Sequence, residues 1–530
     1  MKKYLLSIFA LLLPLLNIAQ DVEKGLDQRI DEAFGDATGW FVNAIFYQID
    51  FGGGVKVFWV LFPLIIGATY FTFYFKLINI RGFLTSINIV RGKYDDIDHH
   101  ETMIAAGDST PGGDSIETIA VEGHEGEVSH FQALTAALSA TVGLGNIAGV
   151  AIAVSIGGAG ATFWMIVAGL LGMASKFVEC TLGVKYRDIE EDGTVYGGPM
   201  YYLTKGLKSK GLEKLGKVLA VLFAIFVIGG SFGGGNMFQV NQAFQLVENI
   251  TGGEQSFLNG YGWAFGLVMA ILVGIVIIGG IKSIAKVTDK IVPFMVVIYV
   301  AASLFVIFVN YDMIGAAFAQ IFEGAFSPEG VAGGAVGVLV QGFRRAAFSN
   351  EAGIGSASIA HSAVKTKYAA SEGMVALLEP FIDTVLVCTM TALVLIITGN
   401  VTAANASLND AQAILLTSGA FESAISWFPY VLTVAVVLFA FSSMISWSYY
   451  GFQGWSYLFG RSKKMEYTYK IIFCIFVIIG AAASLGSVIG FSDAMIFAMM
   501  VPNMIGLVIL APKVRDELKR YMQAIKENKA

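Results

Sequence analysis

Apolar stretches long enough to cross the roughly 30 Å hydrocarbon layer of a bilayer recur along the chain. Short polar segments separate them, and they lie at residues 55–78, 131–158, 160–184, 216–246, 260–281, 291–309, 331–364, 371–398, 426–459, 468–487 and 490–511. The pattern predicts an all-α integral membrane protein with eleven transmembrane helices.

The first twenty residues have the layout of a secretory signal, with Lys2 and Lys3 ahead of an apolar stretch that ends in small residues. A cleavable signal peptide is therefore predicted at 1–20, with a retained first helix as the alternative. The acidic segment that follows, within 21–54, is predicted to be exported.

Lysine and arginine are distributed unevenly over the polar loops. They occur at 76–130, 183–217, 282–290, 365–371, 460–470 and 513–529, and they are absent from 247–259, 310–330, 399–425 and 488–489. Basic loops face the cytoplasm, so the N-terminus is predicted outside and the C-terminus inside the plasma (inner) membrane.

Three further segments complete the predicted organisation. Residues 79–130 form a cytoplasmic loop, and 512–530 form a cytoplasmic tail with a surface helix. The loop contains a polar stretch, 94–129, in which three histidines lie beside carboxylates. Because those ligands have no regular spacing, a mobile solvated loop is favoured over a metal site. A short segment at 411–423 is predicted to be a surface lid helix.

Two of the predicted helices carry polar, glycine-rich breaks in mid-membrane, TVGLGNIAG at 141–149 and FSNEAGIGS at 348–356. An unpaired backbone group is costly in lipid, so such breaks persist only around a cavity or a site. Close packing of small residues is the alternative. Polar side chains beside the glycines favour a site at both breaks, whereas both interpretations remain open for the glycines in 229–235.

The positions of the two breaks indicate an inverted repeat. After an extra first helix at 55–78, they fall in the first and sixth of ten helices, which gives five-helix repeats at 131–309 and 331–511. An in-plane pseudo-twofold axis would bring both breaks to the midplane. There, half-helix ends offer N–H groups to a carboxylate and carbonyls to a cation.

Composition narrows the function. Charged residues make up 14% of the 530 residues, where soluble proteins average roughly 25%. The net charge of −6 gives no basic field, which argues against nucleic acid as a partner. Three cysteines lie in apolar runs, which argues against disulfides and thiolate metal sites.

The motifs absent from the sequence also restrict the function. It contains no catalytic constellation or nucleotide motif, which argues against an enzyme or a pump. A channel would need a continuous polar path, whereas the chain has two isolated breaks. A secondary transporter is therefore favoured over a channel and a membrane enzyme.

Several motifs resemble the alanine/glycine:cation symporter family. They are SHFQAL at 129–134, TVGLGNIAGV at 141–150, GGAGATFW at 157–164, KFVE at 176–179, VKYR at 184–187, GGPMY at 197–201, FSNEAGIGSA at 348–357 and SWSYYG at 446–451. The resemblance implies a leucine-transporter-type fold and cotransport of alanine or glycine with sodium, or less often a proton. Leu144 stands where the family often has threonine.

A zwitterionic substrate needs donors for its carboxylate and acceptors for its ammonium. Gly143, Gly145 and Asn146 are expected at the carboxylate, because glycine lets a backbone N–H approach a ligand closely. Oxygens of the second break are expected at the ammonium, near Phe348, Ser349 and Asn350. The predicted set is completed by Thr141, Asn236, Gln239 and Trp447, of which Trp447 is alternatively a packed aromatic.

Sodium is expected as the transported coupling ion. In the resembling fold, a sodium site joins the first and eighth helices of the ten, which here indicates Ser139, Val142, Ser442 and Ser443. Back-bonding of the serine hydroxyls to their own helix is the alternative.

Arg344 and Arg345 precede the second break, where cations at membrane depth need partners. The candidate partners are Glu179, Glu351, Glu379 and Asp383. A structural ion pair is favoured over a role in proton coupling. The sequence therefore predicts sodium-coupled import of alanine or glycine through the lipid bilayer, without an obligate protein partner, and proton coupling is the alternative.

Overall fold

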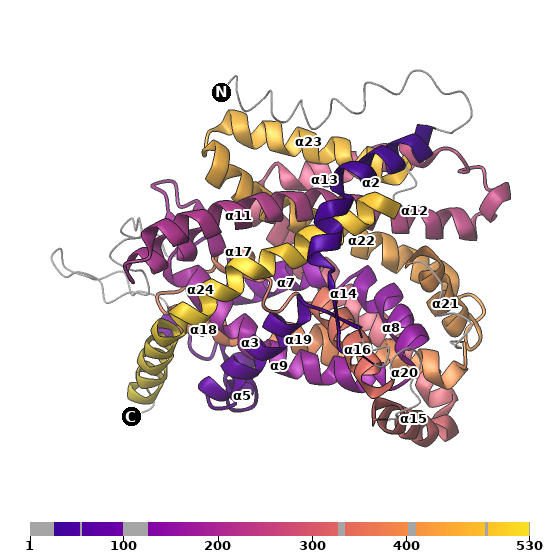
Figure 1. The fold of residues 1–530 in the computed structure, drawn as a ribbon, viewed down its shortest axis with the longest axis horizontal. Coiled ribbons are helices and arrows are strands. Elements are labelled where there is room, and N and C mark those ends of the chain that lie inside the picture. Colours follow the sequence, from indigo (N-terminus) through magenta and orange to yellow (C-terminus); the bar gives the residue numbers. More distant parts are fainter. Residues whose placement is uncertain are drawn as a thin grey trace.

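Helices make up most of the protein. The computed structural model describes residues 26–52, 56–98, 126–326, 334–400, 410–482 and 486–528. The predicted signal peptide and most of the predicted loop at 94–129 lie outside these residues. The described helices are packed together in one bundle (Figure 1), and their buried side chains form a large apolar core.

The N-terminal part begins with a helix that lies along the last helix of the chain. α2 (Leu26–Ile45) packs on α24 (Gly486–Glu527), and a hairpin of β1 (Gln48–Asp50) and β2 (Lys56–Phe58) follows (Figure 1). The next helix, α3 (Leu61–Tyr74), has 14 residues and spans about 21 Å. The predicted first span, 55–78, is therefore helical over only part of its length, because its first residues belong to the hairpin.

Short helices connect α3 to the first repeat, and the repeat itself contains long helices interrupted by π-helical turns. The connecting helices are α4 (Ile78–Arg81), α5 (Phe83–Val90) and α6 (Asp95–Asp98). The elements of the predicted first repeat are α7 (His130–Thr141), η2 (Gly145–Gly149), α8 (Val150–Gly157), α9 (Ala161–Lys185), β3 (Asp188–Ile189), β4 (Val195–Tyr196), α10 (Pro199–Tyr201), η3 (Tyr202–Gly206), α11 (Glu213–Phe232), η4 (Gly233–Met237), α12 (Phe238–Ile250), η5 (Gly253–Gln255), α13 (Gly262–Ile277) and α14 (Gly280–Val309).

The predicted second repeat also contains long helices and a π-helical turn, and its first helix is again broken. Between the repeats lie η6 (Tyr311–Met313) and α15 (Ile314–Phe326). The elements that follow are α16 (Gly334–Asn350), α17 (Ala357–His361), α18 (Ala369–Val375), α19 (Leu378–Pro380), η7 (Phe381–Cys388), α20 (Thr389–Thr398), α21 (Asp410–Glu422), α22 (Phe428–Phe459), α23 (Lys463–Ala482) and α24.

Seven continuous helices of the described residues are long and apolar enough to cross a membrane. An eighth candidate is the pair formed by α7 and η2–α8, which is bent by 56° at the first break. α3 and α13 are apolar but shorter. The protein is therefore a multi-pass membrane protein, and the number eleven stays a prediction.

Two helical segments that were predicted to lie on the surface carry buried side chains. α21 occupies the predicted lid segment, but Ile414, Thr417 and Phe421 on it are fully buried, and it packs on η2 and α22. α24 continues from the membrane through the predicted cytoplasmic surface helix to Glu527, and Tyr521 on this extension is buried. Apolar side chains continue at helical spacing along both segments, so each has a face that can pack on the protein.

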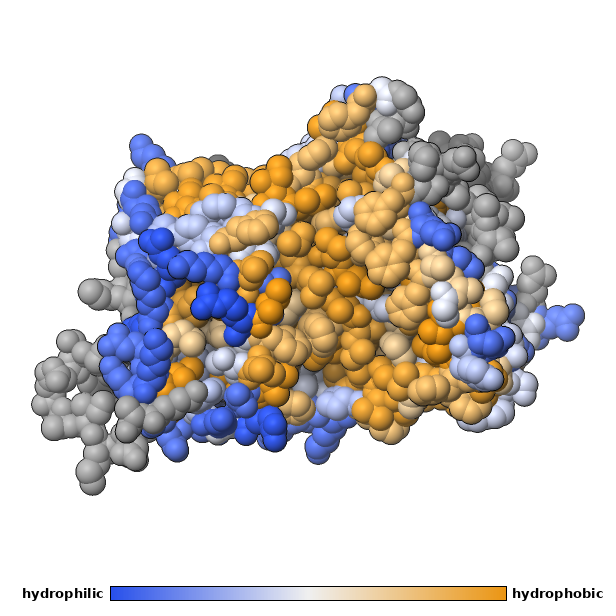
Figure 2. Space-filling model, turned by 90° about the horizontal axis from the view of Figure 1, so that it is seen from below, coloured by the Kyte–Doolittle hydropathy of each residue, from blue (hydrophilic) through white to orange (hydrophobic). Residues whose placement is uncertain are grey.

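The outer surface carries the apolar belt expected of a membrane protein. Figure 2 shows hydrophobic residues across the middle of one face, with hydrophilic residues at both ends and most densely at the left. Large exposed apolar side chains on α13 and α14 include Ile271, Ile275, Val297 and Phe308. An apolar surface of this extent is stable in lipid and would aggregate in water.

Candidate functional site

The first break begins where α7 loses its helical hydrogen bonding. Val142, the C-cap of α7, has an extended backbone (φ −74°, ψ 100°). The next N–H, that of Gly143, donates to Asn146 Oδ1 at 2.7 Å. In a continued helix it would bond to the carbonyl of Ser139. That carbonyl instead accepts a hydrogen bond from Ser443 Oγ on α22 at 3.0 Å.

The two glycines of the first break face different neighbours. A Cβ on Gly143 would lie 3.1 Å from Ser443 Oγ and 3.8 Å from Gln239 Oε1. A Cβ on Gly145 would lie 3.6 Å from the Cα of Ser349, in the second break. Gly143 therefore borders α12 and α22, and Gly145 brings the two breaks together.

The second break is a run of left-handed backbone between α16 and α17. Glu351 has φ +54°, and Gly353 and Gly355 have φ +90° and +100°, a region that glycine adopts without steric cost. Asn350 closes the end of α16, because its Oδ1 accepts the N–H of Ala352 at 3.0 Å. Asn350 Nδ2 is also used by the protein, since it donates to Thr384 Oγ1 at 2.9 Å.

Asn146 and Asp383 join the two breaks. Asn146 Nδ2 donates to Asp383 Oδ1 at 2.7 Å and to Ser349 Oγ at 3.0 Å. Ser349 Oγ donates to Asp383 Oδ2 at 2.7 Å. Both polar ends of the Asn146 side chain thus already bind the protein, and all three residues are buried.

In the sequence, Asp383 was considered as a counter-ion for the arginines before the second break and as a group for proton coupling, but not as a partner of Asn146. The signal that could have found it is the aspartate of the apolar run in 381–388, because a carboxylate at membrane depth marks a functional position. Its partner, Asn146, could not be identified from spacing, since the two residues are far apart in the chain.

Arg344 lies beside aromatic rings and not beside the predicted acids. The guanidinium of Arg344 lies 4.8 Å from the ring centre of Phe58 in β2 and 5.7 Å from that of Phe46. The predicted partner acids have other contacts: Glu351 accepts from Ser356 Oγ, Glu179 accepts from Asn503 Nδ2, and Glu379 pairs with Lys176. These acids are therefore held by other partners than the arginine they were expected to meet, and Arg344 lies against the aromatic rings of the N-terminal hairpin region.

Two buried side chains of the α11–α12 span present unpaired oxygens. Gln239 Nε2 donates to the carbonyl of Gly234 at 3.0 Å, and Asn236 Nδ2 donates to that of Phe473 at 2.8 Å. Carbonyls only accept, so these contacts fix both amide orientations. Gln239 Oε1 and Asn236 Oδ1 then accept no hydrogen bond from any described residue.

Aromatic side chains and glycines pack tightly beside these amides. Trp447 is 2% exposed and leaves no room for a Cβ on Gly235, so it is at least a packed aromatic. The side chain of Ser492 likewise fills the space beside Gly233. Close packing thus accounts for these glycines in 229–235. Phe348 meets Phe238 edge to face at 6.4 Å.

Serines connect α7 to α22 where sodium was predicted. Ser139 Oγ donates to the carbonyl of Ser442 at 2.6 Å, and Ser443 Oγ donates to that of Ser139. Ser442 Oγ instead donates to Phe439 in its own helix at 3.0 Å, which is the back-bonding alternative. Thr141 similarly contacts carbonyls of the preceding turn.

The sequence interpretation missed Ser446. Its hydroxyl donates to the carbonyl of Ala136 at 2.9 Å and to Ser139 Oγ at 3.0 Å. It lies one helical turn after Ser442 and three residues after Ser443, so helical spacing places it beside this pair. That spacing was the available signal.

Outside the membrane-spanning segments, polar contacts tie the loops to the start of α7. Burial raises the pKa of Glu127, although this carboxylate accepts the N–H of Val195 at 2.7 Å and faces Lys282 at 3.8 Å. Arg461 pairs with Asp188 at 2.6 Å and lies 4.2 Å above the ring of Tyr196. Burial raises the pKa of the Tyr196 hydroxyl. These contacts hold the loops in place next to the start of α7, the helix that ends at the first break.

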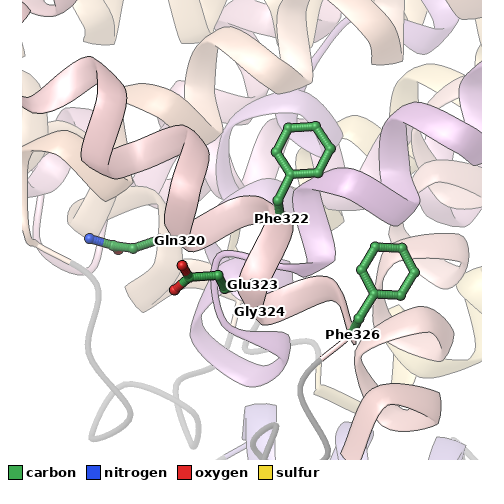
Figure 3. Close-up of a pocket in the computed structure, with 5 residues that line it drawn as sticks. All are labelled: Gln320, Phe322, Glu323, Gly324 and Phe326. Atoms are coloured by element: carbon green, nitrogen blue, oxygen red, sulfur yellow. The ribbon is translucent and has the colours of Figure 1, made fainter.

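A surface hollow of about 520 Å³ lies away from the two breaks. Figure 3 shows its lining residues on α15: Gln320, Phe322, Glu323, Gly324 and Phe326. None of them belongs to the predicted site. The residues between the breaks are instead buried, with Asn146 at 1%, Ser349 at 2% and Gln239 at 8% exposure, so the site is closed in this conformation.

Comparison with a solved structure supports the fold. The chain matches MhsT in complex with L-phenylalanine with a TM-score of 0.50 at 16% identity, covering 74% of this chain and all of that one. MhsT is a transporter of the leucine-transporter fold, so the described architecture is of that type.

Sequence comparisons find relatives with higher identity than this solved structure. The chain is 42% identical to the sodium/alanine symporter AgcS of Methanococcus maripaludis, over 77% of this chain and 87% of that protein. It is 34% identical to the probable sodium/glutamine symporter GlnT of Bacillus subtilis, over 76% and 80%. It is 33% identical to the putative sodium/proton-dependent alanine carrier protein YrbD of the same organism, over 76% and 83%.

A family model defines the class of the protein. The model described as the sodium:alanine symporter family matches residues 45–530, which include both breaks and the serines between α7 and α22. Its members are transporters and not enzymes. The chain therefore belongs to the sodium:alanine symporter family and is a cation-coupled amino-acid symporter.

Proposed function

We propose that the protein imports alanine or glycine by symport with sodium. The observation that carries the substrate part of this proposal is Gln239 Oε1, a buried acceptor beside Gly143 to which none of the described residues donates. Leaving such a group unpaired costs about 1–3 kcal/mol. A substrate ammonium supplies the missing donor.

The carboxylate then lies at the positive end of η2. Backbone N–H groups at the start of a helix bind anions, and the glycines at 143 and 145 allow close approach. The Asn146 side chain holds this turn in place and does not contact the carboxylate, because its amide is bonded to Asp383 and to the N–H of Gly143. The same aspartate would also repel a carboxylate placed beside it.

The surroundings favour a small side chain on the substrate. Phe348 closes the space beside Gly145, and the buried Trp447 packs against Gly235 in the same span as Gln239. Alanine and glycine need little additional room. Similarity to the sodium/alanine symporter AgcS supports the same substrate class.

Sodium fits the oxygens between α7 and α22. The Ser139 carbonyl is released by the first break, and Ser443 Oγ already lies 3.0 Å from it. Together with the carbonyl of Val142 these oxygens provide dipoles without net charge. Such ligands replace the hydration shell of a monovalent cation.

Uptake into proteoliposomes tests this function directly. Labelled alanine and glycine are offered under an imposed sodium gradient or an imposed pH gradient. The proposal expects saturable, electrogenic uptake driven by sodium alone. Uptake that ignores sodium and follows the pH gradient would contradict it and favour proton coupling, for which Asp383 between the breaks is the candidate group.

The Gln239→Leu variant tests the substrate site. It should weaken alanine binding about tenfold to a hundredfold, because the ammonium loses an acceptor worth about 1–3 kcal/mol. Ligand-induced thermal shift measures this effect. Gln245→Leu on the same helix is the matched control, since Gln245 bonds to Asn241 at 2.6 Å outside the site. Unchanged affinity in Gln239→Leu would remove Gln239 from the site.

A further inference from the structure

A buried chain of titratable side chains runs beside the two breaks, and the proposed transport chemistry does not use it. It joins the beginning of α7 to the middle of α9 in the order His130, Glu372, His361, Glu379 and Lys176. Each residue is 5% exposed or less. The chain crosses five helices, α7, α18, α17, α19 and α9.

The contacts alternate between nitrogen and carboxylate oxygen. His130 Nδ1 contacts Glu372 Oε2, and the other oxygen of Glu372 lies 2.5 Å from His361 Nδ1. His361 Nε2 lies 2.5 Å from Glu379 Oε1. Lys176 Nζ donates to the second oxygen of Glu379 at 3.1 Å.

Each of these contacts needs one hydrogen, which sets the number of protons. His130 supplies one as a neutral imidazole, and Lys176 supplies one as an ammonium. A neutral His361 has a single N–H but faces a carboxylate oxygen with both ring nitrogens. The Glu372, His361 and Glu379 group therefore needs one additional proton, whether it resides on the imidazole or on a carboxylate.

Without that proton two lone pairs would face each other at one end of His361. The buried group would also carry an uncompensated negative charge, which is expensive away from water. One of the two contacts of His361 would then have to open. Glu372 bridges His361 and His130 through its two oxygens, so a movement of this carboxylate away from His361 also loosens its contact with His130 at the start of α7. This end of the chain is closest to water, because His130 follows the exposed Ser129.

We propose that Glu372, His361 and Glu379 form a proton-binding site whose occupancy holds the beginning of α7 against α18. The proton enters from and returns to water at the His130 end of the chain. This site is separate from the sodium and amino-acid sites, so it goes beyond the proposed function.

Other charged groups surround the site and support a single proton. Lys176, Glu179 and Cys180 of α9 interact electrostatically with Glu379, as do Glu351 after α16 and Tyr450 of α22. Asp383 of η7 faces Lys176.

Two further elements, α5 and α24, pack on α18. α5 carries no titratable side chain between Phe83 and Val90, and the Glu517 carboxylate of α24 is held by Lys185 at 2.5 Å. Acids thus exceed permanent cations around His361, which favours retention of a proton.

A divalent metal fits this cluster less well. The ligand atoms of Cys180, His361 and Glu379 lie within 4.8 Å of one another. However, both nitrogens of His361 already contact carboxylates, and the ammonium of Lys176 lies beside Glu379. A proton meets the needs of these contacts without displacing any of them.

Cysteine accessibility tests the proposal without requiring transport. Ala133→Cys places a thiol on the first turns of α7, where Ala133 is fully buried. The full-length protein in nanodiscs is labelled with a maleimide from roughly pH 5 to pH 9, the range around histidine titration. Labelling is read peptide by peptide and normalised to Ser209→Cys, an exposed position that cancels the pH dependence of the thiol itself.

We expect little labelling of the Ala133→Cys variant at low pH and more at high pH. Because a single proton is lost, the labelling should rise by at most tenfold per pH unit. Glu372→Gln should keep labelling low at every pH, because the amide donates to His361 without a titratable proton and still accepts from His130. Glu379→Gln should behave the same way, since its amide can donate to His361 and accept from Lys176. Glu517→Gln is the control and should keep the pH dependence of the parent.

Two outcomes would overturn the proposal. One is labelling of the parent that does not change with pH. The other is retention of the parental pH dependence in both glutamine variants. Either result would leave the proposed alanine and sodium transport untouched, because the labelling uses neither substrate nor sodium.

Discussion

Asn146 shows how one buried side chain can determine the shape of a binding site. Its oxygen takes the N–H that would have continued α7, and its nitrogen bonds to Asp383 and Ser349. The break in the first helix and its contact with the second thus depend on the same amide. A hydrophobic residue of equal size would leave several buried polar groups unpaired.

Asn146→Ala should therefore impair folding stability as well as binding. Removing the amide leaves the Gly143 N–H and part of the Asp383 carboxylate without partners, at about 1–3 kcal/mol for each. Thermal unfolding in detergent measures the loss. Asn310→Ala is the control, because the Asn310 side chain donates to the preceding turn of its own helix, at 2.8 Å. Equal effects of the two substitutions would contradict this role of Asn146.

At the residue scale, local sequence predicts where the chain breaks but not which partners meet there. Glycines with an asparagine nearby identified both breaks, because their backbone preferences are local. The role of Asn146 depends on Asp383, which belongs to another helix, so spacing could not reveal it. The free oxygen of Gln239 likewise depends on which way its amide turns. The predicted substrate and sodium residues otherwise remain predictions.

At the scale of elements, α7 and α22 are held together by serines rather than by charges. Ser139, Ser443 and Ser446 each donate across the interface to a carbonyl of the other helix. These bonds are neutral, so a cation can take over the same oxygens without creating a buried net charge. The interface between α7 and α22 could therefore close when a cation binds and open when the cation leaves.

The two neighbouring serines of α22 should respond differently to substitution. Ser443→Ala should raise the sodium concentration for half-maximal uptake several-fold, because a hydroxyl ligand worth about 1 kcal/mol is lost. Alanine affinity should fall by the same factor through linkage. Ser442→Ala should have a smaller effect, since its hydroxyl bonds to its own helix. Sodium titrations of uptake compare them, and a larger effect of Ser442→Ala would contradict the assignment.

Element boundaries followed from apolar length only where a helix runs uninterrupted. α9 and α22 begin and end within a few residues of their predicted limits. α3 is shorter than predicted because Val57 and Phe58 of the hairpin continue the apolar run into the helix. The π-helical turns η2 and η4 have no signature in hydrophobic length, since they arise where glycines and side-chain amides replace regular hydrogen bonds.

At the scale of the whole molecule, orientation in the membrane determines whether transport is import. The concentration of basic residues in one set of loops predicts a cytoplasmic C-terminus. The span from Ala369 to Thr398 separates Lys365 from Asn400. These two residues therefore report the orientation of a single crossing.

Cysteine labelling of intact cells tests this orientation, in a Cys474→Ser background because Cys180 and Cys388 are buried. Asn400→Cys should react with a membrane-impermeant maleimide from outside, since it follows a crossing that begins at a basic loop. Lys365→Cys, at an exposed position, should react only after the cells are permeabilised. Permeabilised cells are the control for intrinsic reactivity at both positions. Labelling of Lys365→Cys in intact cells, with Asn400→Cys protected, would reverse the orientation, and a sodium gradient directed into the cell would then meet the other face of the protein first.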